Sequence, residues 1–208
     1  MIYLLNDKKF KDAKNLPVIL TKFLDKKIDL SFYEALIFSS KNGVYAIDRL
    51  DSRWKNIPAY SIGSGTSKVI KELKGKLFFS ANSSYGDDFA NEIKERLFKK
   101  RALFLRAKVV TSNLNTILKE NGVLLDEEIV YETICNSCKN LKKPPKNSII
   151  IFSSPSTIEC FFKCFDWDKS YKAVAIGKNT ASYLPKDITY KISNEQNLSS
   201  CIKLAKEI

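Results

Sequence analysis

One stretch of this sequence occurs twice, at a constant spacing of 114 residues. The five residues that begin at Leu36 return from Ile150 as an apolar run that ends in two serines. Further along, Ala59, Ile62, Gly63 and Thr66 return as Ala173, Ile176, Gly177 and Thr180. The spacing does not change between the two motifs, so the copies have equal length. A duplication of this kind predicts two similar lobes.

Short apolar runs alternate along the chain with segments whose apolar residues have helical spacing, such as Val44, Ile47 and Leu50. This alternation predicts an α/β fold with mostly parallel sheets, here as two similar flavodoxin-like domains. We expect strands at 1–5, 17–23, 36–40, 59–63, 76–79, 102–105, 124–133, 148–153, 172–176 and 188–192. We expect helices at 42–50, 66–73, 87–98, 114–120, 156–165, 179–184 and 198–208, with a further short one before Asn15.

The units that precede the two serine motifs also match each other. Each has the order strand, helix, strand. If the first unit completes the domain that contains the second serine motif, and the second unit completes the domain that contains the first, then one domain is discontinuous in the sequence. We therefore expect a discontinuous first domain of residues 1–17 and 134–208 and a second domain of residues 24–127. The segments 18–23 and 128–133 would form a two-stranded β linker, so that the chain crosses between the domains twice.

Composition limits the function. The chain has 208 residues, of which 44% are hydrophobic, and no apolar run approaches the length of a membrane span. We expect a cytoplasmic protein that does not contact a membrane. The net charge is +12, but only five basic residues are arginine and the lysines are scattered. This pattern favours a solvated surface that attracts small anions over a nucleic-acid interface, for which basic residues cluster.

The sequence contains no histidine and five cysteines. Without histidine, chemistry must come from hydroxyls, lysines, carboxylates or thiols. Cys135 and Cys138 form a Cys-x-x-Cys motif, and Cys160 and Cys164 lie one helical turn apart, so a four-thiolate zinc site is one interpretation. The interpretation we favour is reduced thiols, with Cys160 and Cys164 as small apolar residues of a buried helix. We accordingly expect no metal.

Four predicted helices begin directly after a strand, and hydroxyl residues or glycine mark these starts. Free backbone amides and the helix dipole favour an anionic group at such a position. Ser and Thr there are also ordinary helix caps, which is the alternative for each of them. We expect these starts to bind a substrate with several carboxylates, through Ser39, Ser40, Gly63, Thr66, Ser154, Ser156, Gly177, Lys178 and Thr180.

Six motifs resemble the uroporphyrinogen-III synthase family in their order and spacing, and the likeness covers nearly the whole chain. Each motif is short, so the resemblance depends on their joint order. They are Phe-Ser-Ser-Lys-Asn-Gly-Val at 38–44, Ile-Gly-x-x-Thr at 62–66 and 176–180, Leu-Arg-Ala at 105–107, the segment 121–133 with its Ile-Val-Tyr-Glu-Thr, and Phe-Ser-Ser-Pro-Ser at 152–156.

The resemblance implies a lyase of tetrapyrrole and heme biosynthesis that converts hydroxymethylbilane to uroporphyrinogen III in a cleft between its domains. The family reaction removes a terminal hydroxyl as water, forms a spiro intermediate, inverts ring D and closes the macrocycle. It needs no cofactor. The substrate is a linear tetrapyrrole with an acetate and a propionate on each ring, which matches a site for several carboxylates.

The resemblance also implies roles for individual residues. Tyr131 matches the tyrosine that is the family's best candidate acid, and a phenol with an ordinary pKa of about 10 stays protonated at neutral pH. Thr180 matches a threonine that we assign to substrate positioning. Arg106 is a candidate carboxylate ligand, although Ala107 stands where the family usually has glycine and a second arginine is missing.

Two other functions are compatible with the sequence. The first is a two-lobed, hinge-type binding protein that holds a polyanionic small molecule without turnover. The second is a nucleic-acid-binding module, which the scattered lysines disfavour. We expect a monomer that binds hydroxymethylbilane and no nucleic acid.

Overall fold

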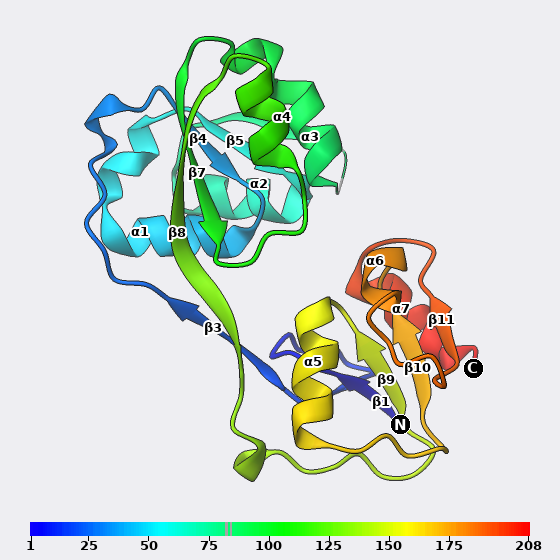
Figure 1. Cartoon of the computed structure of the whole chain (residues 1–208). Helices are drawn as coiled ribbons and strands as arrows, with labels where there is room; N and C mark the ends of the chain where they lie inside the picture. The colour runs from blue at the N-terminus through cyan, green and yellow to red at the C-terminus, as the bar shows by residue number, and fades with distance from the viewer. Residues whose placement is uncertain (82, 84) are drawn as a thin grey trace. The chain divides into compact units, whose positions relative to one another are not determined.

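The chain consists of two compact units in the computed structural model, which describes residues 1–208 except 82 and 84 (Figure 1). Unit 1 comprises Met1–Leu20 and Thr133–Ile208, and unit 2 comprises Thr21–Glu132. No helix in the described part of the chain is long and apolar enough to cross a membrane.

Unit 2 is built around a six-stranded sheet with the order β3-β8-β7-β4-β5-β6. The pairs from β8 to β6 are parallel. Helices α1 and α2 cover one face of this sheet, and α3 and α4 cover the other (Figure 1). The strands are β3 (Ile19–Phe23), β4 (Ala35–Phe38), β5 (Ala59–Ile62), β6 (Leu77–Ala81), β7 (Arg101–Ala107) and β8 (Leu124–Cys135). The helices are α1 (Lys41–Leu50), α2 (Gly63–Glu72), α3 (Gly86–Ile93) and α4 (Leu114–Glu120), with 3-10 turns η1 (Leu30–Phe32), η2 (Ser52–Asn56) and η3 (Glu95–Leu97).

The central strand β4 shows why this sheet needs helices on both faces. All four of its residues are buried, since an apolar run with no alternation has no side that can face water. Leu36 and Phe38 pack with Val44 and Trp54 on the α1 face. Ile37 belongs to the cluster on the α3 face.

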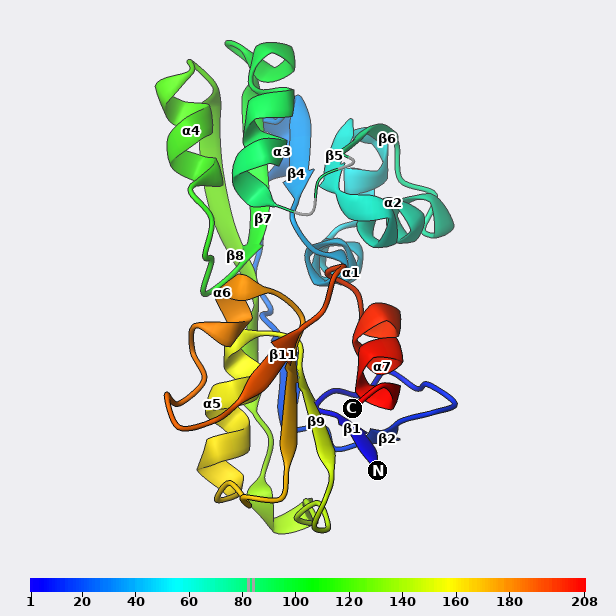
Figure 2. The same cartoon turned by 90° about the vertical axis from the view of Figure 1, so that its right-hand side faces the viewer.

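Unit 1 has a five-stranded parallel sheet with the order β11-β10-β9-β1-β2. Helices α5 and α6 cover one face, and α7 covers the other (Figure 2). The strands are β1 (Ile2–Leu4), β2 (Lys14–Asn15), β9 (Ile149–Phe152), β10 (Lys172–Ala175) and β11 (Tyr190–Ile192). The helices are α5 (Pro155–Cys164), α6 (Lys178–Ala181) and α7 (Leu198–Lys206), and η4 (Cys138–Asn140) is a 3-10 turn.

The duplication seen in the sequence is present in the structure. Helices α1 and α5 each have ten residues, and α5 begins 114 residues after α1. Strand β4 lies between β7 and β5, and its counterpart β9 lies between β1 and β10. The prediction of an α/β protein with two similar parallel sheets is confirmed.

Several expected elements differ from the structure. In place of one helix at 87–98, α3 ends at Ile93 and the 3-10 turn η3 follows it. The prediction of a short helix before Asn15 is wrong. The side-chain amide of Asn15 donates to the carbonyls of Asn6 and Lys8 at 2.7 and 2.8 Å, so these carbonyls have partners without a helix. Helix α2 begins at Gly63, three residues earlier than expected, and this residue turns the chain from β5 into the helix with a φ of +70°, which glycine tolerates. Helix α6 has four residues only.

The expectation of reduced, unpaired cysteines is also wrong for four of the five. Cys135 is bonded to Cys160 and Cys138 to Cys164, and in both pairs the Cα atoms are 5.1 Å apart. The pairing follows from packing: Cys160 and Cys164 are one turn apart on α5 and face the end of β8. Only Cys201, buried in α7, is free.

We predict that Gly43→Ala destabilises the protein by about 1–3 kcal/mol through overpacking between α1 and β7. A Cβ at position 43 would lie 2.7 Å from the carbonyl oxygen of Leu105, which is backbone and cannot rotate away. Denaturant unfolding measures the change. The control is Gly65→Ala, where a Cβ meets nothing within 4 Å, and equal effects of both changes would contradict the prediction.

Candidate functional site

The predicted site residues of unit 2 lie at one edge of its sheet. Because β4, β5, β7 and β8 are parallel, their carboxyl ends share an edge, which is where open α/β sheets bind ligands. Ser39 and Ser40 follow β4, Gly63 and Thr66 follow β5, Arg106 is near the end of β7, and Tyr131 is on β8.

Ser40 holds the start of α1. Its hydroxyl accepts a hydrogen bond from the backbone N–H of Asn42 at 3.2 Å, and its carbonyl accepts from that of Gly43 at 3.1 Å. Ser39 and Ser40 are both half-buried. The alternative interpretation of Ser40 as a helix cap is therefore correct, and its hydroxyl has a lone pair left for a second partner.

A serine network that the sequence did not reveal supports the start of α2. The Ser67 hydroxyl lies 2.8 Å from that of Ser61 and 2.5 Å from that of Ser80, and it donates to the carbonyl of Gly63 at 3.1 Å. This network fixes the turn that carries Gly63. No side chain caps α2, so Thr66 does not act as its cap.

A β-bulge determines where Tyr131 points. Arg106 pairs with Ile129 but Ala107 pairs with Tyr131, so Val130 is an extra residue in β8. Without the bulge, strand alternation would place Tyr131 on the same face as Glu127, toward α4. With it, Tyr131 packs in the cluster of Phe38 and Val44 beneath α1. Bulges commonly re-aim a side chain in this way.

Tyr131 and Ser40 are therefore brought together. Tyr131 is only 6% exposed. Burial raises the pKa of its phenol above the ordinary value, and the adjacent Ser40 hydroxyl opposes part of that shift. The folded protein thus holds Tyr131 protonated up to a higher pH than a free tyrosine. A protonated phenol beside a hydroxyl at this edge can donate a proton to a bound group.

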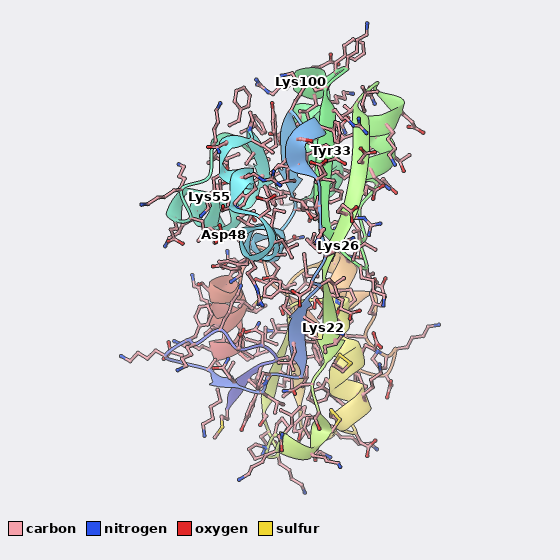
Figure 3. The ribbon with its side chains drawn as sticks, turned by 90° about the vertical axis from the view of Figure 1, so that its left-hand side faces the viewer. Lys22, Lys26, Tyr33, Asp48, Lys55 and Lys100 are labelled. Atoms are coloured by element: carbon pink, nitrogen blue, oxygen red, sulfur yellow. A yellow bond between two sulfur atoms is a disulfide. The ribbon has the colours of Figure 1, made fainter. Side chains whose placement is uncertain are left out.

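Ion pairs hold β8 on either side of Tyr131. Lys26 pairs with Glu128, and Glu132 accepts from both Lys22, at 3.5 Å, and Lys108, at 3.1 Å. Lys22 lies on β3 and Lys26 follows it (Figure 3). The backbone N–H of Leu24 donates to Val130 and that of Asn136 donates to Val18, so β3 and β8 run in opposite directions.

Arg106 lies on the other face of the sheet from Tyr131. Its Nε donates to Oε2 of Glu127 at 2.7 Å, and its Nη1 donates to the carbonyl of Ala107 at 2.9 Å. Burial tends to raise the pKa of Glu127, but bonds from Asn115, Lys119 and Arg106 lower it below the ordinary value. Arg106, Asn115 and Glu127 line a pocket of about 380 Å³ that also includes Lys108 and Ser112.

In unit 1, the two predicted serines occupy the start of α5. The Ser154 hydroxyl accepts from the backbone N–H of Thr157, and the Thr157 hydroxyl accepts from that of Ser154. This reciprocal capping box satisfies both donors. Ser156 lies in the first turn of α5 and is half-buried.

Gly177, Lys178 and Thr180 follow β10. Gly177 is extended, and a Cβ there would meet Nε2 of Gln196 at 2.9 Å, so this side chain occupies the space that we expected a ligand to use. Lys178 is exposed. Gln196 is a neighbour that sequence reasoning missed, because it is distant in the chain.

Thr66 and Thr180 have matching environments in their two units. They are 7% and 5% exposed, and neither hydroxyl has a hydrogen-bond partner among the described residues. No fully buried side-chain oxygen in that part of the chain lacks a partner, so both hydroxyls must reach the surface. Each threonine is therefore almost buried, with part of its hydroxyl at the surface of its unit.

With four cysteines in disulfides, the described residues contain no group of three or more acidic, histidine or cysteine side chains that could hold a metal ion. The candidate residues of the two units are hydroxyls, one buried phenol, glycine turns and scattered cations.

Comparisons with known proteins identify the family. A family model described as "Uroporphyrinogen-III synthase HemD" matches residues 11–203. The crystal structure of uroporphyrinogen-III synthetase from Helicobacter pylori 26695 is 30% identical with a TM-score of 0.86, and the match covers 99% of this chain and 98% of that one. A mutant uroporphyrinogen III synthase from the extremely thermophilic bacterium Thermus thermophilus is 14% identical with a TM-score of 0.53, covers 94% and 88%, and shows the fold alone. A search of curated proteins finds no match. On the family model and the Helicobacter structure, this chain belongs to the uroporphyrinogen-III synthase family.

Proposed function

We propose that Tyr131 is the acid in the reaction that this chain catalyses. As a member of its family, the chain is a cyclising hydro-lyase that converts hydroxymethylbilane to uroporphyrinogen III in tetrapyrrole biosynthesis. The observation that carries the proposal is the position of the phenol: it is buried, its pKa is raised, and it contacts Ser40 at the carboxyl edge of the sheet.

The proton transfer balances within one turnover. The Tyr131 phenol donates its proton to the terminal hydroxyl of the substrate, which leaves as water and generates an azafulvene cation. Ring D then attacks through its substituted carbon, the spiro intermediate reopens and recloses, and the macrocycle loses one proton. That proton returns to the phenolate. Because its pKa is raised, the phenol is fully protonated at neutral pH at the start of each turnover, as a general acid must be.

Substrate carboxylates are held, in this proposal, by hydroxyls and backbone amides rather than by arginines. Unit 2 contributes Ser39, Ser40, Gly63 and Thr66, and unit 1 contributes Ser154, Ser156, Lys178 and Thr180. The turn at Gly177 contributes only if the ligand displaces the Gln196 side chain that packs against it. Arg106 is retained as a weaker candidate, because Glu127 already neutralises its charge. Many weak ligands suit a flexible substrate, since most of the catalytic work is to hold one conformation.

The test supplies the purified protein with freshly made hydroxymethylbilane and separates the product isomers. We expect mainly the III isomer, because unaided closure gives the symmetric I isomer and only inversion of ring D gives III. Formation of the I isomer at the uncatalysed rate, with the substrate nevertheless bound, would instead indicate a hinge-type binding protein and would overturn the assignment of Tyr131.

We further propose that the enzyme acts in the cytoplasm as a monomer, without a cofactor and without nucleic acid. The scattered lysines support the absence of a nucleic-acid partner, since they lack the clustering of a nucleic-acid interface. They still give a positive field that attracts a polyanionic substrate. Sedimentation at working concentration tests the monomer. Unchanged activity with added DNA tests the absence of a nucleic-acid partner.

A further inference from the structure

Four of the five cysteines of unit 1 form a cluster that the reaction does not use. Cys135 ends β8 and Cys138 begins η4, while Cys160 and Cys164 project from successive turns of α5. Cys135 is opposite Cys160 and Cys138 is opposite Cys164, and the Cα atoms of each of these two pairs are 5.1 Å apart. Four sulfur atoms therefore converge from two segments, each of which contributes two.

We propose that this cluster is a zinc site when its disulfides are reduced. A structural zinc ion takes four thiolates in a tetrahedron with Zn–S distances of about 2.3 Å, which places neighbouring sulfurs about 3.8 Å apart. A Cys-x-x-Cys turn facing a pair of cysteines one helical turn apart supplies that set. Reduction frees each side chain to rotate about Cα–Cβ, which lets the sulfurs of a pair separate toward this distance.

The backbone around the site is held by bonds that do not depend on the disulfides. The N–H and the side-chain amide of Asn136, inside the Cys-x-x-Cys turn, donate to the carbonyls of Val18 and Pro17, each at 2.8 Å. On the other side, Cys160 is 2% exposed and packs in the core cluster of Phe152 and Phe161. We expect these contacts to keep the two segments, with two thiols on each, close together after reduction.

Charge and access also suit zinc. A zinc ion with four thiolates has a net charge of −2, and residues 135–164 contain five lysines and one glutamate. The lysines, Lys139, Lys142, Lys143, Lys146 and Lys163, favour the thiolate forms and offset that charge. Cys138 is exposed, so a reductant and the ion can both reach the site.

The chemistry balances at each step. A phosphine reductant and one water per disulfide give two thiols and a phosphine oxide. Four thiols bind one Zn²⁺ and release four protons. In the reverse direction, two molecules of a small disulfide accept four electrons from the bound thiolates, which form the two protein disulfides and release Zn²⁺.

The experiment reduces the full-length protein with a phosphine under nitrogen, removes metal, and titrates Zn²⁺ against a chromophoric chelator. We expect about one zinc per reduced chain, none in the oxidised protein, and at least a 100-fold weaker affinity in Cys138→Ser and in Cys164→Ser. Cys201→Ser is the matched control, because Cys201 is buried in the same unit but outside the cluster, and it should bind zinc like the wild type.

Absence of stoichiometric zinc in the reduced protein would overturn the proposal and leave the cluster as two structural disulfides. So would equal zinc affinity in Cys138→Ser and wild type. Addition of a small disulfide to the zinc form should release the metal in step with the loss of free thiols. Retention of the metal while thiols are lost would also count against a four-sulfur site.

Discussion

Replacement of Tyr131 by phenylalanine is expected to lower kcat by about 100-fold while KM changes by less than about threefold. General acid catalysis contributes roughly 10²- to 10⁴-fold, and the lower end applies where the substrate assists its own ionisation. The ring remains in its cluster beneath α1, so the fold is retained. Initial rates of III-isomer formation measure the change, and unfolding checks the fold.

Tyr60→Phe is the matched control for this result. Tyr60 is also a buried tyrosine of unit 2 with a raised pKa, but it packs on the α3 face, away from Ser40. It should keep the kcat of the wild type. Unchanged turnover in Tyr131→Phe would remove the phenol from the acid role and leave the protein as a mould for a self-ionising substrate.

The pH dependence follows from the direction of the pKa shift. Because the folded pKa of Tyr131 is raised, the acid form is fully present below about pH 10, the ordinary value, and is lost only as the pH rises through the folded value. The rate should therefore show no falling limb from this group below about pH 10. A limb near pH 8 that is absent in Tyr131→Phe would contradict this assignment.

The order of elements could be predicted because each signal is local. Helix α4 has the bounds expected for it, since its apolar residues, its closing Asn-Gly and its neighbours all lie within a few positions. The strands that precede Ser40 and Thr180 end within two residues of the expected positions, at Phe38 and Ala175. The segment before Asn15 has no such apolar stripe, and its structure depends on a side-chain amide instead.

The contacts of the site could not be predicted, because they depend on partners distant in the sequence. The face of Tyr131 is set by a bulge against β7, and periodicity alone would place the side chain on the wrong side of the sheet. The ion pair of Arg106 depends on Glu127, on the neighbouring strand. The cysteine pairs depend on how α5 packs against the end of β8.

The duplicated threonines lead to the second large effect. In Thr66→Val and Thr180→Val the volume is kept and the buried methyl remains, but the surface hydroxyl is lost. A hydrogen bond to a charged group contributes about 1.5–3 kcal/mol, so each change should lower kcat/KM by about 10- to 100-fold. Stability should be almost unchanged, because neither hydroxyl has a partner among the described residues.

Thr157→Val separates substrate binding from folding. Its hydroxyl is fully buried, donates to the Ser154 carbonyl at 2.6 Å and completes the capping box of α5, so its loss should cost about 1 kcal/mol of stability with little effect on kcat/KM. The double variant Thr66→Val/Thr180→Val then tests the meaning of the duplication. If both hydroxyls bind the same substrate molecule through separate carboxylates, the two losses in kcat/KM should multiply. A double variant no worse than the poorer single one would show that only one copy of the repeat contributes to binding.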